Sequence, residues 1–226
     1  MELKDLLMFD ENEHKYFIFG DNPIPIPSVT QLLKYVRIIS DFEIPMHYAE
    51  RGTEVHNLSE VIDAGQFNWN MVSDVSRPYI ASYMNFRNEN KIILNTSEER
   101  VFHNELFYAG TLDRQWNLNG VDTITDLKTG NHAGWHNLQL GAYHAAKGVS
   151  ANIAISNLYL TPEKYQIRMW DKADTEYAIK SIEHIAACYW MGHKRDYAKL
   201  QGLALELCSQ GNEVVEREDD FFFSRG

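Results

Sequence analysis

Two aspartates and a lysine in this sequence are spaced so that a β-hairpin would bring them together in one charged patch. An Asn-Gly dipeptide at positions 119–120 separates two β-prone runs, a pattern that predicts a tight two-residue turn. Pairing outward from this turn places Asp113 opposite Asp126 on one face, with Cβ atoms about 4.5–5.5 Å apart. Lys128 follows Asp126 by two residues, so it is expected on the same face.

Such a patch is suited to a divalent cation. Like charges that face each other repel, and we expect the two carboxylates to have no side-chain partner that neutralises them. Hard oxygen ligands favour Mg²⁺ or Mn²⁺, and a bound ion activates water. A lysine beside it would hold the attacking water as a point charge. The alternative is an ordinary solvated strand face, where the repulsion costs only about 1 kcal/mol.

A third carboxylate is expected to join the patch from the preceding strand. If that strand turns back at residues 104–105, Glu98 faces Thr111 and shares the face of Asp113. A loop one residue longer would place Glu99 there instead, and the turn signal in this segment is weak. We favour Glu98.

Several polar residues on predicted helices have a structural interpretation and a functional one. Gln139 and Tyr143 lie four residues apart and therefore share a face, which by itself is typical of the polar edge of an amphipathic helix. His56 is a lone helix histidine, a type that is more often packed or solvated than a ligand. His132 and His136 have the spacing of zinc-binding helices, but they lack a nearby acidic base and a third ligand. We interpret them as polar residues at a helix start.

Five short motifs occur in an order that is typical of one nuclease family. They are Gly52-X-X-X-His56, Glu98-X-X-Val101, Gly110-Thr-Leu-Asp113, Asp126-Leu-Lys-Thr-Gly130 and Gln139-X-X-X-Tyr143. With them, the chain resembles the RecB-like branch of the PD-(D/E)XK nuclease superfamily, and within it the phage-type exonucleases without an iron–sulfur cluster. The resemblance by motif covers roughly residues 10–145; beyond them only the order of strands and helices agrees.

The resemblance implies a metal-dependent DNA exonuclease that acts in phage or prophage DNA recombination or processing. It implies that one or two Mg²⁺ or Mn²⁺ ions are bound by Asp113, Asp126, His56 and the Leu127 carbonyl, with Glu98 as a further acidic member. It also implies that Lys128 orients the attacking water and helps to deprotonate it. Gln139 and Tyr143 would then steady the substrate phosphate or the lysine. An endonuclease on the same fold and a catalytically inactive binding or assembly module stay open as alternatives.

Composition limits the class of protein. With 226 residues, 44% of them apolar, the chain suits one large domain with a proper core. No apolar run approaches the roughly 20 residues of a membrane span, and the N-terminus lacks signal-peptide features. We therefore expect a cytoplasmic location, in the host if the protein is phage-encoded. Cys188 and Cys208 lie far apart, which excludes a disulfide framework and a four-cysteine zinc site or iron–sulfur cluster.

The net charge of −11 argues against a passive DNA-binding module, which draws affinity from phosphate neutralisation. It argues less against a metal-dependent nuclease, because cations neutralise the carboxylates of such an enzyme. Residues 213–226 combine acids with adjacent aromatic side chains. We interpret this tail as a frayed end or a last packing segment; the alternative is a docking segment for a strand-annealing protein. The sequence leaves open whether the chain forms a homo-oligomer.

The expected fold is α/β, with a central mixed β-sheet flanked by helices as in restriction endonucleases. We expect a single nuclease domain over residues 1–226: a mainly helical part at 1–95, the catalytic sheet with an embedded helix at 96–172, a helical region at 173–212, and the tail. The predicted strands are 6–10, 15–20, 98–103, 107–117, 121–128, 152–160 and 165–170, and the predicted helices are 28–36, 45–63, 75–90, 135–148 and 174–210.

Overall fold

A five-stranded mixed β-sheet forms the centre of the protein. The computed structural model describes residues 2–11, 13–40, 45–148 and 152–219. Neighbouring strands follow the order β4-β5-β6-β7-β8. Their bounds are β4 Ile92–His103, β5 Tyr108–Leu118, β6 Val121–Lys128, β7 Ala154–Leu160 and β8 Tyr165–Trp170. β6 and β7 are parallel and the other neighbours are antiparallel, which confirms the expected α/β class with a mixed sheet.

A smaller antiparallel sheet precedes it, with bounds β1 Leu7–Asp10, β2 Lys15–Ile18 and β3 Ile24–Ile26. A 3₁₀ helix, η1 (Leu3–Leu6), comes before β1. An isolated bridge between Ser28 and Ala109 joins the end of this segment to β5. The small sheet is therefore attached to the end of β5 that is remote from the Asn-Gly turn.

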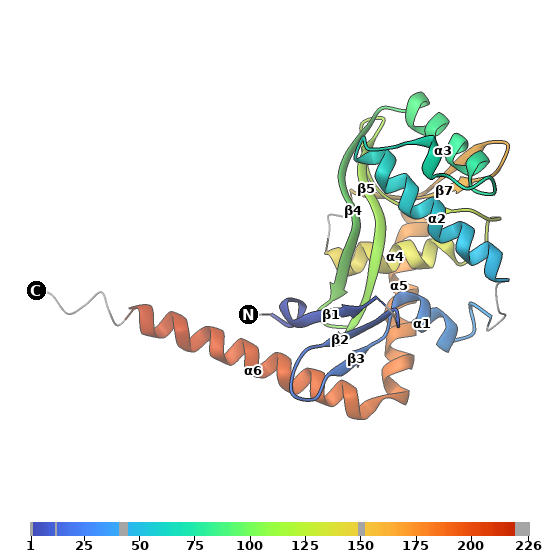
Figure 1. Ribbon diagram of the computed structural model, residues 1–226. Helices are drawn as coiled ribbons and strands as arrows, with labels where there is room; N and C mark the ends of the chain where they lie inside the picture. Colours follow the sequence, from blue (N-terminus) through green and yellow to red (C-terminus); the bar gives the residue numbers. More distant parts are fainter. Residues whose placement is uncertain (1, 12, 41–44, 149–151, 220–226) are drawn as a thin grey trace, which may run out of the picture.

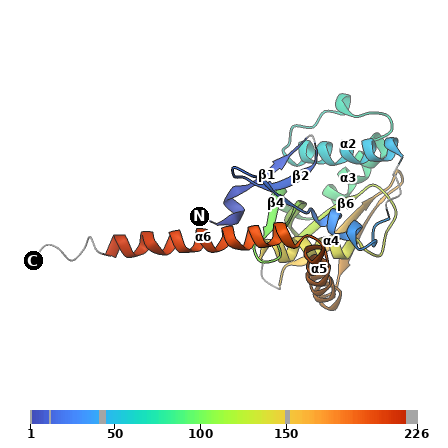
Figure 2. The ribbon, with the colours of Figure 1, turned by 90° about the horizontal axis from the view of Figure 1, so that it is seen from below.

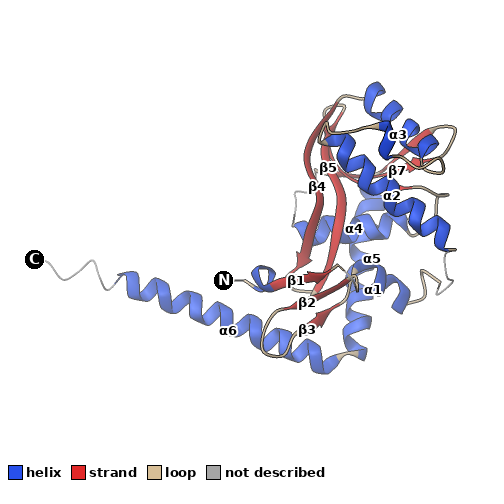
Figure 3. Ribbon diagram, viewed as in Figure 1, coloured by secondary structure: helices blue, strands red, loops and turns tan. Residues whose placement is uncertain are grey.

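Helices cover both faces of the central sheet (Figures 1 and 3). Their bounds are α1 Val29–Tyr35, α2 Met46–Asp63, η2 Trp69–Met71, α3 Arg77–Glu89, α4 His136–Lys147, α5 Lys172–Gly192 and α6 Lys194–Asp219. Leu127 of β6 belongs to the buried cluster of α2 and α3. Ile124 of the same strand is buried with Leu140 of α4. Since alternate strand residues face opposite sides, α2 and α3 lie on one face and α4, backed by α5, lies on the other.

The start of α1 shows how local sequence fixes an element. The Ser28 hydroxyl accepts a hydrogen bond from the Gln31 amide at 3.1 Å, and the Gln31 side chain accepts one from the Ser28 amide at 2.8 Å. This is the capping box that the Ser-Val-Thr-Gln sequence predicts. α1 thus begins at Val29, directly after β3, and its buried Leu32 and Leu33 join the core cluster beside α4.

Part of the predicted organisation needs correction. Residues 1–95 contain the predicted strands 6–10 and 15–20 as β1 and β2, but also β3 and the first residues of β4, which the prediction lacks. The single long helical region predicted near the C-terminus consists of two helices that meet at His193, and α6 projects away from the rest of the molecule (Figure 2). Residues 213–219 of the predicted tail are part of α6, and residues 220–226 lie outside the described residues.

Among the described residues, no helix has both the length and the apolar character that crossing a bilayer requires.

Candidate functional site

The Asn-Gly turn sets the register of the hairpin that carries the predicted acids. Asn119 has φ +53° and Gly120 has φ +93°, as expected for the central residues of a type I′ turn. Paired positions run without a shift from Leu118 opposite Val121 to Arg114 opposite Thr125. The predicted register is therefore confirmed, and Asp113 and Asp126 occupy the next position, immediately beyond the last pair.

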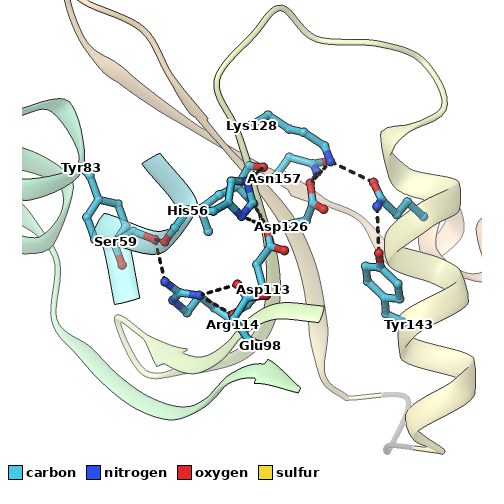
Figure 4. Close-up of polar contacts among 12 residues, drawn as sticks. His56, Ser59, Tyr83, Glu98, Asp113, Arg114, Asp126, Lys128, Tyr143 and Asn157 are labelled. Atoms are coloured by element: carbon cyan, nitrogen blue, oxygen red, sulfur yellow. Dashed lines mark hydrogen bonds and ion pairs between the residues drawn. The ribbon is translucent and has the colours of Figure 1, made fainter. Parts of the chain in front are cut away.

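At that position side chains replace the backbone ladder. The Leu127 amide donates to Asp113 Oδ2 at 2.6 Å, and the Leu127 carbonyl lies 3.1 Å from His56 Nε2. His56 comes from α2, and its Nδ1 lies 3.5 Å from Asp113 Oδ2. Two candidate metal ligands thus bind the backbone amide and carbonyl of Leu127, which fixes both side chains. Figure 4 shows His56 and Asp113 next to each other.

The tautomer of His56 follows from this contact. A carbonyl oxygen only accepts, so His56 Nε2 must carry the proton. In the neutral imidazole, the lone pair of Nδ1 then faces the carboxylate of Asp113, and two acceptors 3.5 Å apart repel each other. A proton or a cation between them removes that repulsion. This contact is the first indication that the residues present fit a bound metal ion.

Glu98 reaches the patch, although the predicted pairing that led to it is wrong. Arg100, not Glu98, pairs with Thr111. The turn between β4 and β5 comprises residues 104–107, because the His103 ring nitrogen Nδ1 accepts from the amides of Glu105 and Leu106. The register therefore shifts by two positions from the prediction and brings Glu98 opposite Asp113.

The β4–β5 ladder is distorted where Glu98 meets Asp113. Neither residue is in a regular pair, although their neighbours on both sides are, and Glu98 has φ +46°. This left-handed conformation is uncommon for a residue other than glycine and is often found at functional sites. Ligand atoms of His56, Glu98 and Asp113 all lie within 4.8 Å of one another, so the three could share one ion. Glu99, the alternative, instead pairs with Lys147 of α4.

A buried arginine holds Glu98 from behind. Arg114 has no exposed surface; its Nη1 lies 3.3 Å from Glu98 Oε1, and its Nε lies 2.7 Å from Asp63 Oδ2. It also donates to the Ser59 hydroxyl at 2.7 Å. Asp63 and Ser59 belong to α2, the helix that carries His56. Arg114 of β5 therefore connects Glu98 of β4 with α2, the helix that carries His56.

Asp126 has partners that the sequence interpretation did not include. Its Oδ2 lies 2.7 Å from Lys128 Nζ and accepts from the Asn157 amide group at 3.1 Å. The expectation of unneutralised carboxylates is thus wrong for Asp126. Asp126 also lies outside the group of His56, Glu98 and Asp113 that could share an ion. Its carboxylate is instead paired with the lysine.

Gln139 and Tyr143 line up behind the lysine as predicted. Lys128 Nζ donates to Gln139 Oε1 at 2.9 Å, and the Gln139 amide group donates to the Tyr143 hydroxyl at 2.8 Å. Gly110 of β5 makes room for this tyrosine, since a Cβ at that position would lie 2.5 Å from Tyr143 Cε1. The Gln139 side chain of α4 thus fixes the Lys128 ammonium, and Tyr143 of the same helix fixes Gln139.

The electrostatics show excess negative charge where the acids meet. Burial, followed by the charge of Asp113, raises the pKa of Glu98 to about 7. Burial also raises the pKa of Asp126; Lys128 opposes this shift and Asp113 adds to it. A bound cation would reverse these shifts because it favours the ionised carboxylates. The donor set, two carboxylates and an imidazole with a carbonyl beside them, suits Mg²⁺ or Mn²⁺.

The Leu127 carbonyl is adjacent to the candidate ligands but already accepts from His56. A carbonyl oxygen has two lone pairs, so one remains for an ion. The structure therefore places every predicted ligand at one patch, with Glu98, Asp113 and His56 in ligating proximity and Asp126 paired to the lysine.

His136 is a core residue. It lies at the first position of α4, is buried, and its Nδ1 is 2.8 Å from the Tyr159 hydroxyl. The prediction that His136 lies at a helix start is thus confirmed, but its side chain points into the protein. His132 is exposed, with Nε2 2.6 Å from Arg168. Neither contact is a metal site.

We expect His136→Gln to weaken the acid sensitivity of folding. Burial and the charge of Lys128 lower the pKa of His136 to about 4, whereas an unfolded histidine titrates near 6.5. The unfolded state therefore takes up the proton first, and stability that is present above pH 6.5 is lost as pH falls towards 4, by about 3 kcal/mol at most. Urea unfolding at about pH 7.5 and pH 4.5 measures this loss, with the exposed His47→Gln as control. An unchanged pH slope in His136→Gln contradicts the assignment.

Comparison with known proteins adds no family. No protein-family description matches the chain, and the comparison with curated proteins found no match. One solved structure, described as "Crystal structure of SSO0001", aligns with 67% of this chain and 81% of its own at 13% identity and a TM-score of 0.25. A likeness at that level supports no statement about function.

Proposed function

We propose that this protein is a Mg²⁺- or Mn²⁺-dependent deoxyribonuclease, and specifically an exonuclease of phage-type DNA recombination or processing in the cytoplasm. The observation that supports it best is the convergence of His56, Glu98 and Asp113 beside the paired Asp126 and Lys128. Acids, an imidazole and a lysine that is held in place are the groups that phosphodiester hydrolysis needs.

Each residue has a chemical task in this proposal. His56, Glu98 and Asp113 would hold one or two ions, with Asp126 joining them once its lysine turns to the water. A bound ion would supply an activated water and polarise the phosphoryl oxygen. Lys128, fixed by Gln139 at 2.9 Å, would orient that water for in-line attack and take part in its deprotonation. Tyr143 would keep Gln139 in place.

The proposal is tested by digesting linear DNA labelled at one end, with Mg²⁺ and with EDTA, beside a covalently closed circle. We expect label to be released from linear DNA only with Mg²⁺, and the circle to stay intact because an exonuclease needs a free terminus. Cleavage of the circle would indicate an endonuclease. No cleavage of either substrate, together with no heat of Mg²⁺ binding in calorimetry, would indicate an inactive binding or assembly module, and would reject the proposal.

A further inference from the structure

A cavity of about 690 Å³ opens directly beside Lys128. It lies where the parallel strands β6 and β7 end, the place at which open α/β sheets bind ligands, and its volume is typical of ligand sites. Helices α2, α3 and α4 each contribute to its wall. The side chains that matter below are Tyr48, Arg51, Tyr79, Lys128 and Trp135.

Arg51 is a cation in this wall that is held in place without being neutralised. Its Nη2 donates to the Thr129 carbonyl at 2.8 Å, and its guanidinium lies 5.0 Å from the ring centre of Tyr48 and 4.6 Å from that of Tyr79. Its Nε is buried without a hydrogen-bond partner, and within the described residues no carboxylate forms an ion pair with it. A guanidinium fixed in this way suits the two oxygens of a phosphodiester.

Trp135 gives the same cavity an aromatic surface. The indole is half-buried at the start of α4, with Lys128 Nζ 5.8 Å from its ring centre. Protein aromatic rings next to arginine and lysine bind unpaired nucleobases by stacking, regardless of sequence. The wall therefore offers a phosphate site and a base site within one pocket.

The size of the pocket and the charge of the chain both favour an unpaired strand. A cavity of about 690 Å³ is of the size that encloses a small ligand such as one or two nucleotides, whereas a DNA duplex is too wide to enter it. A long duplex track draws its affinity from many neutralised phosphates, and a net charge of −11 is poorly suited to that. A short contact with one strand needs only a few cations.

We propose that this cavity binds an unpaired nucleotide next to the scissile phosphate, with its phosphate on Arg51 and its base stacked on Trp135. The substrate is then a DNA strand with a single-stranded end. This inference rests on the proposed function in one respect, the placement of the nucleotide next to a phosphate that is hydrolysed. The binding itself does not require hydrolysis. It can therefore be measured with the chemistry switched off.

The experiment is fluorescence anisotropy in EDTA with a labelled single-stranded oligonucleotide and a blunt duplex of the same length. We expect the single strand to bind more tightly, and Arg51→Ala and Trp135→Ala each to weaken it by roughly 5- to 100-fold. A matched arginine–tryptophan pair serves as control: Arg77 lies 5.5 Å from the ring centre of Trp69, outside the cavity lining. Arg77→Ala and Trp69→Ala should change binding by less than about twofold.

Conservative variants separate a binding defect from a folding defect. Trp135→Phe keeps an aromatic face and should retain most of the affinity, whereas Arg51→Lys loses the planar fork and should not. Native affinity in both alanine variants, or tighter binding of the blunt duplex, overturns the cavity assignment even if Mg²⁺-dependent cleavage is observed. Weaker binding by both variants in a protein that never cleaves DNA would leave the cavity assignment standing and reject the nuclease.

Discussion

The Lys128→Met protein is expected to degrade linear DNA about 10²–10⁴ times more slowly than the native chain, the usual contribution of a positioned acid–base group. Methionine keeps an unbranched apolar chain but removes the ammonium that lies 2.7 Å from Asp126 and 2.9 Å from Gln139. It also leaves the buried Asp126 carboxylate without its cation, so the pKa of Asp126 rises further. A protonated Asp126 cannot help to hold a metal ion.

Single-turnover digestion at saturating Mg²⁺ measures this loss, and urea unfolding reports its structural cost. We expect Lys128→Met to lose about 3 kcal/mol of stability through the unpaired acid, and a second change, Asp126→Asn, to restore part of it. The control is Lys147→Met, which removes another largely buried lysine of an ion pair. Its partner is Glu99, which is not part of the group of His56, Glu98 and Asp113. Rates within about threefold of native are expected for this control. A native rate in Lys128→Met would refute the role given to the lysine.

The hairpin was predictable because its information is local. Two residues, Asn119 and Gly120, determine the turn type, and a two-residue turn leaves one register for everything that follows. The positions of Asp113, Asp126 and Lys128 then follow from strand periodicity alone. The same holds for the capping box at the start of α1 and for the i, i+4 pair of Gln139 and Tyr143, which needs only a helix.

Glu98 shows the limit of that reasoning. Glu98 lies close to Asp113 as expected, but the two-residue turn at 104–105 on which the prediction rests is wrong. The real turn is longer because the His103 ring accepts two backbone amides, a contact without a short sequence signature. A longer loop shifts the register of the strand pair. The positive φ of Glu98 changes the direction of its side chain, and strand periodicity cannot predict a positive φ.

Side-chain contacts between residues far apart in the sequence could not be predicted. Asn157 and Arg114 occupy strands at positions where a buried polar side chain is unexpected, and their partners Asp126, Asp63 and Glu98 are 31, 51 and 16 residues away along the chain. Only one signal was available: Arg114 directly follows a predicted metal ligand. Whether such an arginine faces solvent or an acid depends on how α2 packs on the sheet, which a single sequence does not specify.

We expect Arg114→Met to destabilise the protein by about 3–5 kcal/mol, the typical cost of breaking a buried ion pair by removing one partner. Asp63, with a 2% exposed side chain, would lose its 2.7 Å partner and, among the described residues, keep Arg87 and the Tyr83 hydroxyl. Glu98 would lose the guanidinium that lies 3.3 Å from its Oε1 atom. Urea unfolding measures the stability, and calorimetry measures Mg²⁺ affinity, which should fall because the Glu98 side chain is no longer fixed.

The informative comparison is with an exposed arginine in the same sheet. Arg100 of β4 is half-exposed and lies 3.5 Å from Glu11, so Arg100→Met should cost less than about 1 kcal/mol. Arg114→Lys tests geometry separately: it keeps the charge but cannot reach Asp63, Glu98 and Ser59 at once, because an ammonium lacks the planar fork of a guanidinium. We expect it to lose Mg²⁺ affinity even under conditions in which it remains folded. If Arg114→Met cost no more than Arg100→Met, the network would be incidental, and the position of Glu98 would have to be set by the distorted β4–β5 ladder alone.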